Sequence, residues 1–341
     1  MMNNLFQLLG LIACLSIVQC EFLGGTIFWM FEPSTDEVRL IYRLSWKKGT
    51  GPCGPGCNVS DIGTLGSVSS PSLLPLSWNL VTPASSLKVS DVNYVVTSVS
   101  IKNNNFAWEH GENRFTVKWS YGDEMKIRFD NIPWILSGNY VKPRLGAMET
   151  IIKYGIRADT KRMNASPYVS IPSMIGIPID CESMVQIPVE DMDGDVIKCR
   201  LAMTSECADA CTNLPDRTFW IDQTSCSITI YSYPDFGYVQ DKLYRLTLVV
   251  EDFPRHPTTR GTQTYNITEN MSTVPIQLTI HTTNGPCHST RDTLKFVKST
   301  PPHHVRQSYK PRDYLRKVLV NNTYYLQGSS RVHIRQVSST S

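Results

Sequence analysis

The stretch EVRLIYRLSWKK at residues 37–48 decides the fold class, because apolar and polar side chains alternate along it. Alternate positions of a β-strand share one face, so this pattern predicts a strand with one buried face. Short runs of the same kind, broken by Gly, Pro, Asn and Ser, fill residues 21–162. One of them, NFAWEHGENRFTVKWSY at 105–121, predicts a hairpin with its turn at residues 110–113. We therefore predict an all-β first domain, a β-sandwich, over residues 21–162.

The first twenty residues predict secretion. They contain an apolar run from Leu5 to Val18 without acids or bases, typical of a signal peptide cleaved after Cys20. The run is shorter than the roughly 20 residues that span a bilayer, and no later stretch is long enough, so we expect no transmembrane segment in the mature chain. Five sequons for N-glycosylation follow, at Asn58, Asn164, Asn266, Asn270 and Asn321.

Cysteine and charge also divide the chain. Removing residues 1–20 leaves eight cysteines, and an even number in a secreted chain predicts disulfides. Residues 288–341 hold ten Lys or Arg and two Asp, a net charge of +8, whereas residues 1–287 carry a net charge of −5. We therefore expect a basic C-terminal tail, flexible or cut short, which as an alternative would bind acidic glycans. His303 and His304 in this tail are expected to be solvated.

The usual catalytic and nucleotide-binding motifs HExxH, GxSxG and the glycine-rich phosphate loop do not occur in the sequence. Cys53 and Cys57 form a CxxxC pair in a Gly and Pro loop, and this half of the chain offers no matching second pair of zinc ligands. A disulfide Cys53–Cys57 is therefore favoured over a metal site. We expect a protein that is not an enzyme and that does not bind nucleic acid.

Three stretches between residues 166 and 286 resemble a cadherin repeat. Asp191 and Asp193 in VEDMDGDVIKCR (189–200) match the acidic DxD loop of that family. The other two matches are TFWIDQTSCSITI (218–230) and YRLTLVVEDF (244–253), which ends near Asp252. The resemblance implies a second, cadherin-like β-sandwich domain over residues 163–287.

The resemblance also implies a calcium site at Asp191, Asp193 and Asp252. Calcium takes six to eight oxygens, and the linker that reads DxNDN in cadherins is Thr282-Thr283-Asn284-Gly285-Pro286 here. The competing interpretation is a tight turn, in which Gly194 adopts positive φ and Asp191 and Asp193 accept hydrogen bonds from turn amides. Beyond this calcium ion we expect no cofactor.

In a seven-strand sandwich of this type the remaining six cysteines have a reasonable pairing, although six cysteines allow fifteen connectivities. Cys181 and Cys287 would meet at one pole, Cys207 and Cys211 are near neighbours, and Cys199 would join Cys226. We expect these disulfides to provide the stiffness that calcium provides elsewhere.

The chain as a whole is similar to a two-part arrangement of extracellular proteins in marine invertebrates, whose function is undetermined. The resemblance rests on Gly24-Gly25-Thr26 with Trp29, on the YRLSW strand and on the cysteine-bearing second domain. It implies a secreted or cell-surface location, and it alone suggests the organic matrix of a mineralised skeleton as a setting.

These observations predict a secreted, glycosylated, disulfide-linked extracellular matrix or adhesion protein, with matrix or cell-surface proteins as partners. Two alternatives stay open. A receptor ectodomain or glycan-binding module would stack sugars on Trp46, Trp78, Trp108, Trp119 or Trp134. A secreted hydrolase would use the acids Glu190, Asp191, Asp193 and Asp195, which lie in an expected surface turn.

Overall fold

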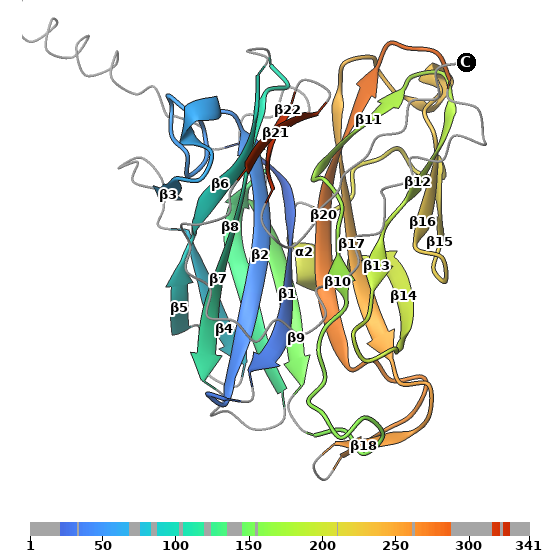
Figure 1. Cartoon of the computed structure of the whole chain (residues 1–341). Helices are drawn as coiled ribbons and strands as arrows, with labels where there is room; N and C mark the ends of the chain where they lie inside the picture. The colour runs from blue at the N-terminus through green and yellow to red at the C-terminus, as the bar shows by residue number, and fades with distance from the viewer. Residues whose placement is uncertain are drawn as a thin grey trace, which may run out of the picture.

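A computed structural model describes residues 21–32, 34–67, 76–82, 87–101, 105–118, 124–134, 145–153, 156–209, 211–260 and 263–287, and the backbone of 316–320 and 323–327. The described chain is predominantly β-strand, as the alternating sequence patterns predict (Figure 1). Helical structure within these ranges is limited to α2 (Thr204–Cys207) and the 3₁₀ turns η1 (Val59–Asp61) and η2 (Pro234–Phe236).

The first hydrophobic core lies between two groups of antiparallel strands. One group contains β1 (Phe22–Glu32), β2 (Glu37–Lys47), β3 (Leu65–Ser67), β6 (Asn93–Ser100) and β7 (Trp108–Lys118). The other contains β4 (Ser77–Thr82), β5 (Leu87–Asp91), β8 (Glu124–Pro133) and β9 (Leu145–Lys153). Aromatic side chains fill the space between them. The ring centroids of Tyr42 (β2) and Trp78 (β4) are 5.2 Å apart, and those of Phe22 and Trp46 are 4.9 Å apart.

The predicted hairpin at residues 105–121 is wrong. Residues 108–118 form the single strand β7, which pairs with β2 from Glu37–Lys118 to Lys47–Trp108 without interruption. Gly111, which we expect in a turn, instead makes room for a neighbour, because a Cβ built there would lie 1.9 Å from the Tyr94 ring. A glycine selected for close packing has the same sequence signature as a glycine selected for a turn.

The second core lies between two further layers, shown at the right of Figure 1. One layer has the order β11 (Met174–Pro178), β20 (Ser272–Thr283), β17 (Leu243–Phe253), β14 (Val196–Leu201), and the other has the order β12 (Glu182–Gln186), β16 (Ser227–Tyr231), β15 (Phe219–Asp222). Smaller pairs are β10 (Tyr168–Val169) with β13 (Val189–Glu190), and β18 (Thr258–Arg260) with β19 (Gln263–Tyr265). Phe28 of β1 also belongs to this second core.

Strand β20 joins the two cores into one continuous sheet. One edge of β20 pairs with β17 along its whole length. The other edge is shared by three strands: β9 pairs at Thr273, β1 pairs at Ile276 and Gln277, and β11 runs parallel to Thr279–Thr283. The boundary that we predict near residue 162 therefore separates two cores, but backbone pairing crosses it.

Glycines and buried polar side chains allow this close approach. A Cβ at Gly24, whose φ is +136°, would lie 2.2 Å from the Gln277 carbonyl oxygen, so this position requires glycine. The Gln277 side chain donates to the Ala147 carbonyl at 2.6 Å, and the Thr150 hydroxyl donates to the Thr273 carbonyl at 2.6 Å. These two side-chain donors thus hydrogen-bond across the seam, which avoids the cost of leaving them unpaired.

The structure contains four disulfides, and they are the pairs that we predict: Cys53–Cys57, Cys181–Cys287, Cys199–Cys226 and Cys207–Cys211. Cys199 lies on β14 and Cys226 directly precedes β16, so their bond connects the two layers around the second core. In the chain-entropy model this bond contributes about 3.5 kcal/mol, and the longer loop closed by Cys181–Cys287 contributes about 4.7 kcal/mol.

Part of the predicted flexible tail is ordered as a hairpin. β21 (Arg316–Val320) pairs with β22 (Thr323–Gln327), and β22 adds to β6 through Thr323–Tyr325. The remainder of the tail, including His303 and His304, and the sequon Asn321 lie outside the described residues.

Candidate metal centre

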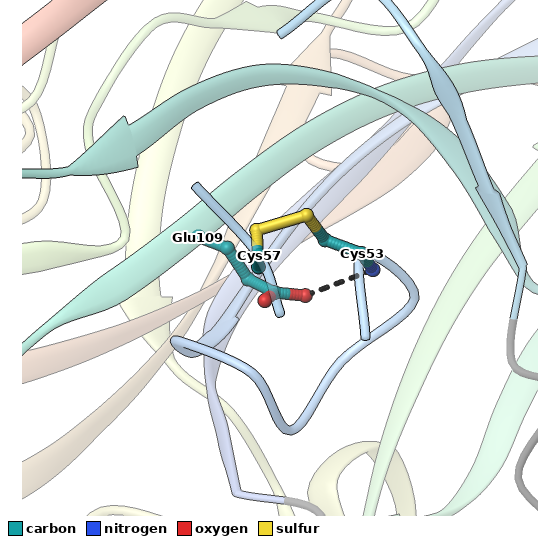
Figure 2. A group of neighbouring side chains, drawn as sticks. All are labelled: Cys53, Cys57 and Glu109. Carbon is teal, nitrogen blue, oxygen red and sulfur yellow. Dashed lines mark hydrogen bonds between the residues drawn. A yellow bond between two sulfur atoms is a disulfide. The ribbon is translucent and has the colours of Figure 1, made fainter. Parts of the chain in front are cut away.

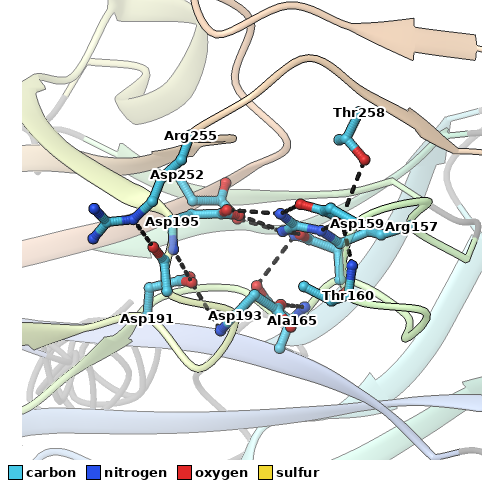
Figure 3. A network of polar contacts seen from close by, with 12 residues as sticks. Arg157, Asp159, Thr160, Ala165, Asp191, Asp193, Asp195, Asp252, Arg255 and Thr258 are labelled. Atoms are coloured by element: carbon cyan, nitrogen blue, oxygen red, sulfur yellow. Dashed lines mark hydrogen bonds and ion pairs between the residues drawn. The ribbon is translucent and has the colours of Figure 1, made fainter.

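The acidic stretch DMDGD forms a turn between β13 and β14, and a network of polar contacts surrounds it (Figure 3). Asp191 opens the turn, and its Oδ1 accepts hydrogen bonds from the amides of Asp193 and Asp195, each at 2.9 Å. Gly194 has φ +78° and its carbonyl accepts a hydrogen bond from the Arg255 side chain. The predicted tight turn is therefore present, with Asp191 as the residue that closes it.

The hydrogen bond of the Asp193 side chain differs from the predicted one. Its carboxylate accepts a hydrogen bond from the Ala165 amide at 2.7 Å, which belongs to the segment leading from β9 into β10. Asp193 thus binds the turn to the preceding connection and does not bond to turn amides.

Arg157, from the same connection, is the buried cation of the network. Its side chain is 1% exposed, and its Nη2 lies 2.8 Å from Asp195, which accepts a second bond from Nη1. The same guanidinium donates to both oxygens of Asp159, at 2.9 Å and 2.6 Å, and lowers the pKa of that carboxyl. Because buried ion pairs are costly to break, this clasp fixes the connection against the DMDGD turn.

Asp252, near the end of β17, is fully buried beside the turn. One carboxylate oxygen accepts a hydrogen bond from the Asn164 amide at 2.9 Å, and the other accepts one from the Ser272 hydroxyl at 2.8 Å. Asn164 also accepts a hydrogen bond from Arg157 at 2.7 Å, so it bridges the guanidinium and the buried carboxylate.

One oxygen in this network is left without a partner. Asp191 Oδ2 is buried, and no group of the described residues hydrogen-bonds to it. Oxygens of Asp191, Asp195 and Asp252 lie within 4.8 Å of one another. Calcium binds oxygens at about 2.3–2.6 Å, so oxygens at this mutual distance can share one ion. An unpaired buried oxygen at that position is what a cation or a proton would satisfy.

The pKa values of the buried carboxyls also indicate that the site favours a bound proton or cation. Burial raises the pKa of Asp191 to about 8, and the negative charge of Asp252 adds to the shift. Burial also raises the pKa of Asp252, to about 6. Figure 3 shows the carboxylates of Asp159, Asp191, Asp193, Asp195 and Asp252 close to the guanidinium groups of Arg157 and Arg255. The surplus negative charge needs protons or a cation to offset it.

The group of acids that the structure brings together therefore differs in one member from the predicted Asp191, Asp193 and Asp252. Asp195 takes the place of Asp193, and the acidic spacing of DMDGD is compatible with either. Arg157 and Asn164 were not predicted as members, because no local pattern marks a residue that reaches a turn more than 25 positions away. Glu190, named for the hydrolase alternative, is not part of the group of three acids.

The burial of Asn164 contradicts its use as a glycosylation site in this fold. The residue is 1% exposed, and its amide nitrogen, to which a glycan would be attached, donates to Asp252 and to the Ala165 carbonyl. A sequon reports only three residues and contains no information on burial. Asn58 and Asn266 are exposed and Asn270 is half-buried, so these sequons have more accessible side chains.

A second group, Cys53, Cys57 and Glu109, is a structural clasp (Figure 2). The two sulfur atoms are bonded to each other and offer no thiolate to a metal. The buried Glu109 carboxylate accepts hydrogen bonds from the Gly49 and Cys53 amides, at 2.8 and 3.1 Å, and from the Tyr94 hydroxyl at 2.8 Å. Glu109 thus holds the Gly and Pro loop against β7.

The tryptophans proposed for sugar stacking are mostly in the first core. Trp46, Trp78 and Trp134 are 0–2% exposed and Trp108 is half-buried, while Trp119 lies outside the described residues. Three of the five predicted stacking platforms are therefore inaccessible to a glycan, as expected for aromatic residues that fill a core.

Comparison of the chain with protein families, with curated proteins and with solved structures finds no match. Across the described ranges, no helix has the length and apolar character needed to cross a membrane.

The raised pKa values predict a pH dependence of stability. A folded state whose carboxyl pKa is raised binds more protons than the unfolded chain, so in a chelator the free energy of unfolding should fall as pH rises from about 4 to about 8. Asp191→Asn keeps the oxygen that closes the turn and removes the charge. We expect it to flatten this slope and to be more stable than the wild type at pH 8 by about 1 kcal/mol or more.

The measurement is urea denaturation at pH 5 and pH 8, with Asp222→Asn as the control. Asp222 lies in an exposed turn, where the Thr224 side chain lowers its carboxyl pKa to about 2, so its substitution should leave the slope between these pH values unchanged. An equal slope in the wild type and in Asp191→Asn would show that the carboxylate pair does not hold a proton.

Proposed function

We propose that this chain is a secreted, non-enzymatic structural protein of an extracellular matrix or of a cell surface. The observation that carries the proposal is that all eight cysteines after the predicted signal are paired in four disulfides. Disulfides persist in oxidising compartments and are rare in reducing ones. Two of these bonds join segments 27 and 106 positions apart, which is typical of covalent stiffening and differs from a redox-active local pair.

We also propose that residues 163–287 form a cadherin-like β-sandwich domain, and the second core supports this. Its layers β11–β20–β17–β14 and β12–β16–β15 enclose one hydrophobic cluster, as two sheets of a β-sandwich do. The acidic turn and the end of β17 meet at one end of these layers, where the chain enters from the first core (Figure 3). A stiff arrangement of this kind suits a protein that bears load or presents surfaces, with matrix or cell-surface proteins as partners.

Expression of the full chain, with residues 1–20 intact, in a secreting animal cell line tests the proposal. We expect the protein in the medium or the deposited matrix, without free thiols, and with glycans at Asn58 but not at Asn164. The readouts are fractionation, thiol titration and glycopeptide mapping. Retention of a reduced, unglycosylated protein in the cytoplasm would refute an extracellular role.

The acidic network gives the proposal a second, metal-dependent part: a calcium ion held by Asp191, Asp195 and Asp252. The ion would satisfy the unpaired Asp191 oxygen and offset the surplus negative charge. Arg157 limits the site, because it already occupies both oxygens of Asp195 from one side. Three protein carboxylates supply fewer than the six to eight oxygens that calcium takes, so backbone carbonyls or water would complete the shell and weak binding is expected.

Calorimetric titration of the secreted protein with calcium at pH 7 tests this part. We expect a dissociation constant in the range of about 0.1–1 mM, typical of extracellular modules. We also expect release of a proton on binding, because burial raises the pKa of Asp191 to about 8 and the ion displaces its proton. Titration in two buffers of different ionisation enthalpy measures the proton. Asp252→Asn should abolish binding and Asp222→Asn should not.

Heat without proton release, or binding that persists in Asp252→Asn, would place calcium elsewhere. No binding at millimolar calcium would leave the network as an ion-free clasp, and the structural role would then rest on the disulfides alone.

A further inference from the structure

Strand β12 is an edge strand whose second edge is unpaired among the described residues. Its layer has the order β12–β16–β15, and no described strand lies on the far side of β12. Its register with β16 runs from Glu182–Tyr231 to Gln186–Ser227 without a bulge. An unpaired regular edge is a template for a further strand.

The outward backbone groups of β12 can be identified from the ends of the ladder. The Ser232 amide donates to the Cys181 carbonyl, and the Ile187 amide donates to the Cys226 carbonyl. Partners in an antiparallel ladder alternate between hydrogen-bonded and non-hydrogen-bonded pairs, so the odd-numbered residues face β16. The N–H and C=O groups of Glu182, Met184 and Gln186 therefore face the unpaired edge.

Two of the other edges, β11 and β5, carry features that discourage pairing. β11 ends in Pro178, and β5 lies opposite a bulge at Trp78 and Asn79, next to an ion pair between Lys88 and Asp91. Proline, bulges and lysine on an edge strand are the usual protections against association. β12 has none of them, and its central residue Met184 is 41% exposed.

We propose that β12 of one molecule pairs with β12 of a second copy of this chain, antiparallel and about a two-fold axis at Met184. In this register the two Met184 residues lie opposite each other, and each Glu182 lies opposite Gln186 of the other copy. All three outward residues of each strand then take part, which gives about six backbone hydrogen bonds across the axis.

The side chains favour a second copy as the partner. Glu182, Met184 and Gln186 lie on the same outer face of the layer, because they alternate with the buried Val185 and Ser183. In the proposed register each carboxylate meets the side-chain amide of Gln186, which would exchange its hydrogen bond to the Ser225 carbonyl of its own molecule for one to the carboxylate. The two methionines form an apolar contact at the centre. No like charges face each other, so the strand is complementary to itself.

The proposed interface is small, since it comprises one short strand from each copy. Interfaces of that size are weak and transient, so we expect dimers only at high concentration or where the protein is crowded. Such pairing would join the three-stranded layers of two molecules into one six-stranded layer, and it is independent of calcium and of the predicted partners.

Sedimentation velocity of the secreted full-length protein, from about 1 to 200 µM, tests the proposal. We expect a monomer–dimer equilibrium in the wild type and a monomer throughout in Met184→Pro. Proline at this position removes an amide that β16 does not use, so the variant should keep its fold. Its melting temperature provides that control.

A cysteine variant tests the register without relying on proline. All cysteines of the described chain are in disulfides, so Met184→Cys introduces a single thiol. We expect Met184→Cys to form a covalent dimer on mild oxidation, and Glu182→Cys to form at least tenfold less, because its own copy lies about 13 Å away along the strand. A wild type that is monomeric at 200 µM, or equal cross-linking of the two variants, would overturn the proposal.

Discussion

The second edge of β20 is the constraint on which the rest of this structure depends. A strand in the middle of a sheet has two rows of backbone groups to satisfy, and β20 satisfies its second row with three different strands from both halves of the chain. The close approach requires glycine at Gly24, where any side chain would collide with the Gln277 carbonyl. β20 contributes to the second core and is joined to the strands of the first core by backbone pairing and by hydrogen bonds.

The polar network and the disulfides extend this constraint to the ends of the shared strand. Ser272, the first residue of β20, donates to Asp252, and Asp252 is linked through Asn164 to Arg157 in the connection between the cores. The chain beyond β20 is tied back by Cys181–Cys287. The connection, the acidic turn and both ends of β20 are thus held together by ion pairs, hydrogen bonds and a covalent bond. These links support the structural role that we propose.

Sequence patterns predict the strands of this fold far better than their partners. The alternation in residues 37–48 identifies β2 and its buried face correctly, and the four cysteine pairs follow from spacing and the expected sandwich. In β20 the same reasoning gives only half of the answer. Thr273, Gln277 and Thr279 alternate with apolar residues, a pattern typical of a strand with one solvent-facing side, yet all three are buried. Their polar side chains hydrogen-bond to residues of the first half of the chain. The alternation of polar and apolar residues cannot distinguish a polar residue that bonds to protein from one that faces water.

The candidate site shows the same limit. The acidic turn and Asp252 are visible as a local motif and as a strand end, whereas Arg157 and Asn164 become part of the site only when the connection folds back over the turn. A buried arginine has no periodic signal, and the two carboxylates that it binds are 2 and 38 positions away. The exchange of Asp193 for Asp195 depends on which carboxylate the Ala165 amide binds, which is a detail of tertiary packing.

We expect the shared strand to make the two cores one cooperative unit. Differential scanning calorimetry of the full-length, non-reduced protein tests it most directly. We expect a single transition whose calorimetric and van't Hoff enthalpies agree, because unfolding either core removes hydrogen bonds that the other core shares through β20. Two separated transitions would contradict it, and would show that residues 21–162 and 163–287 unfold as independent domains.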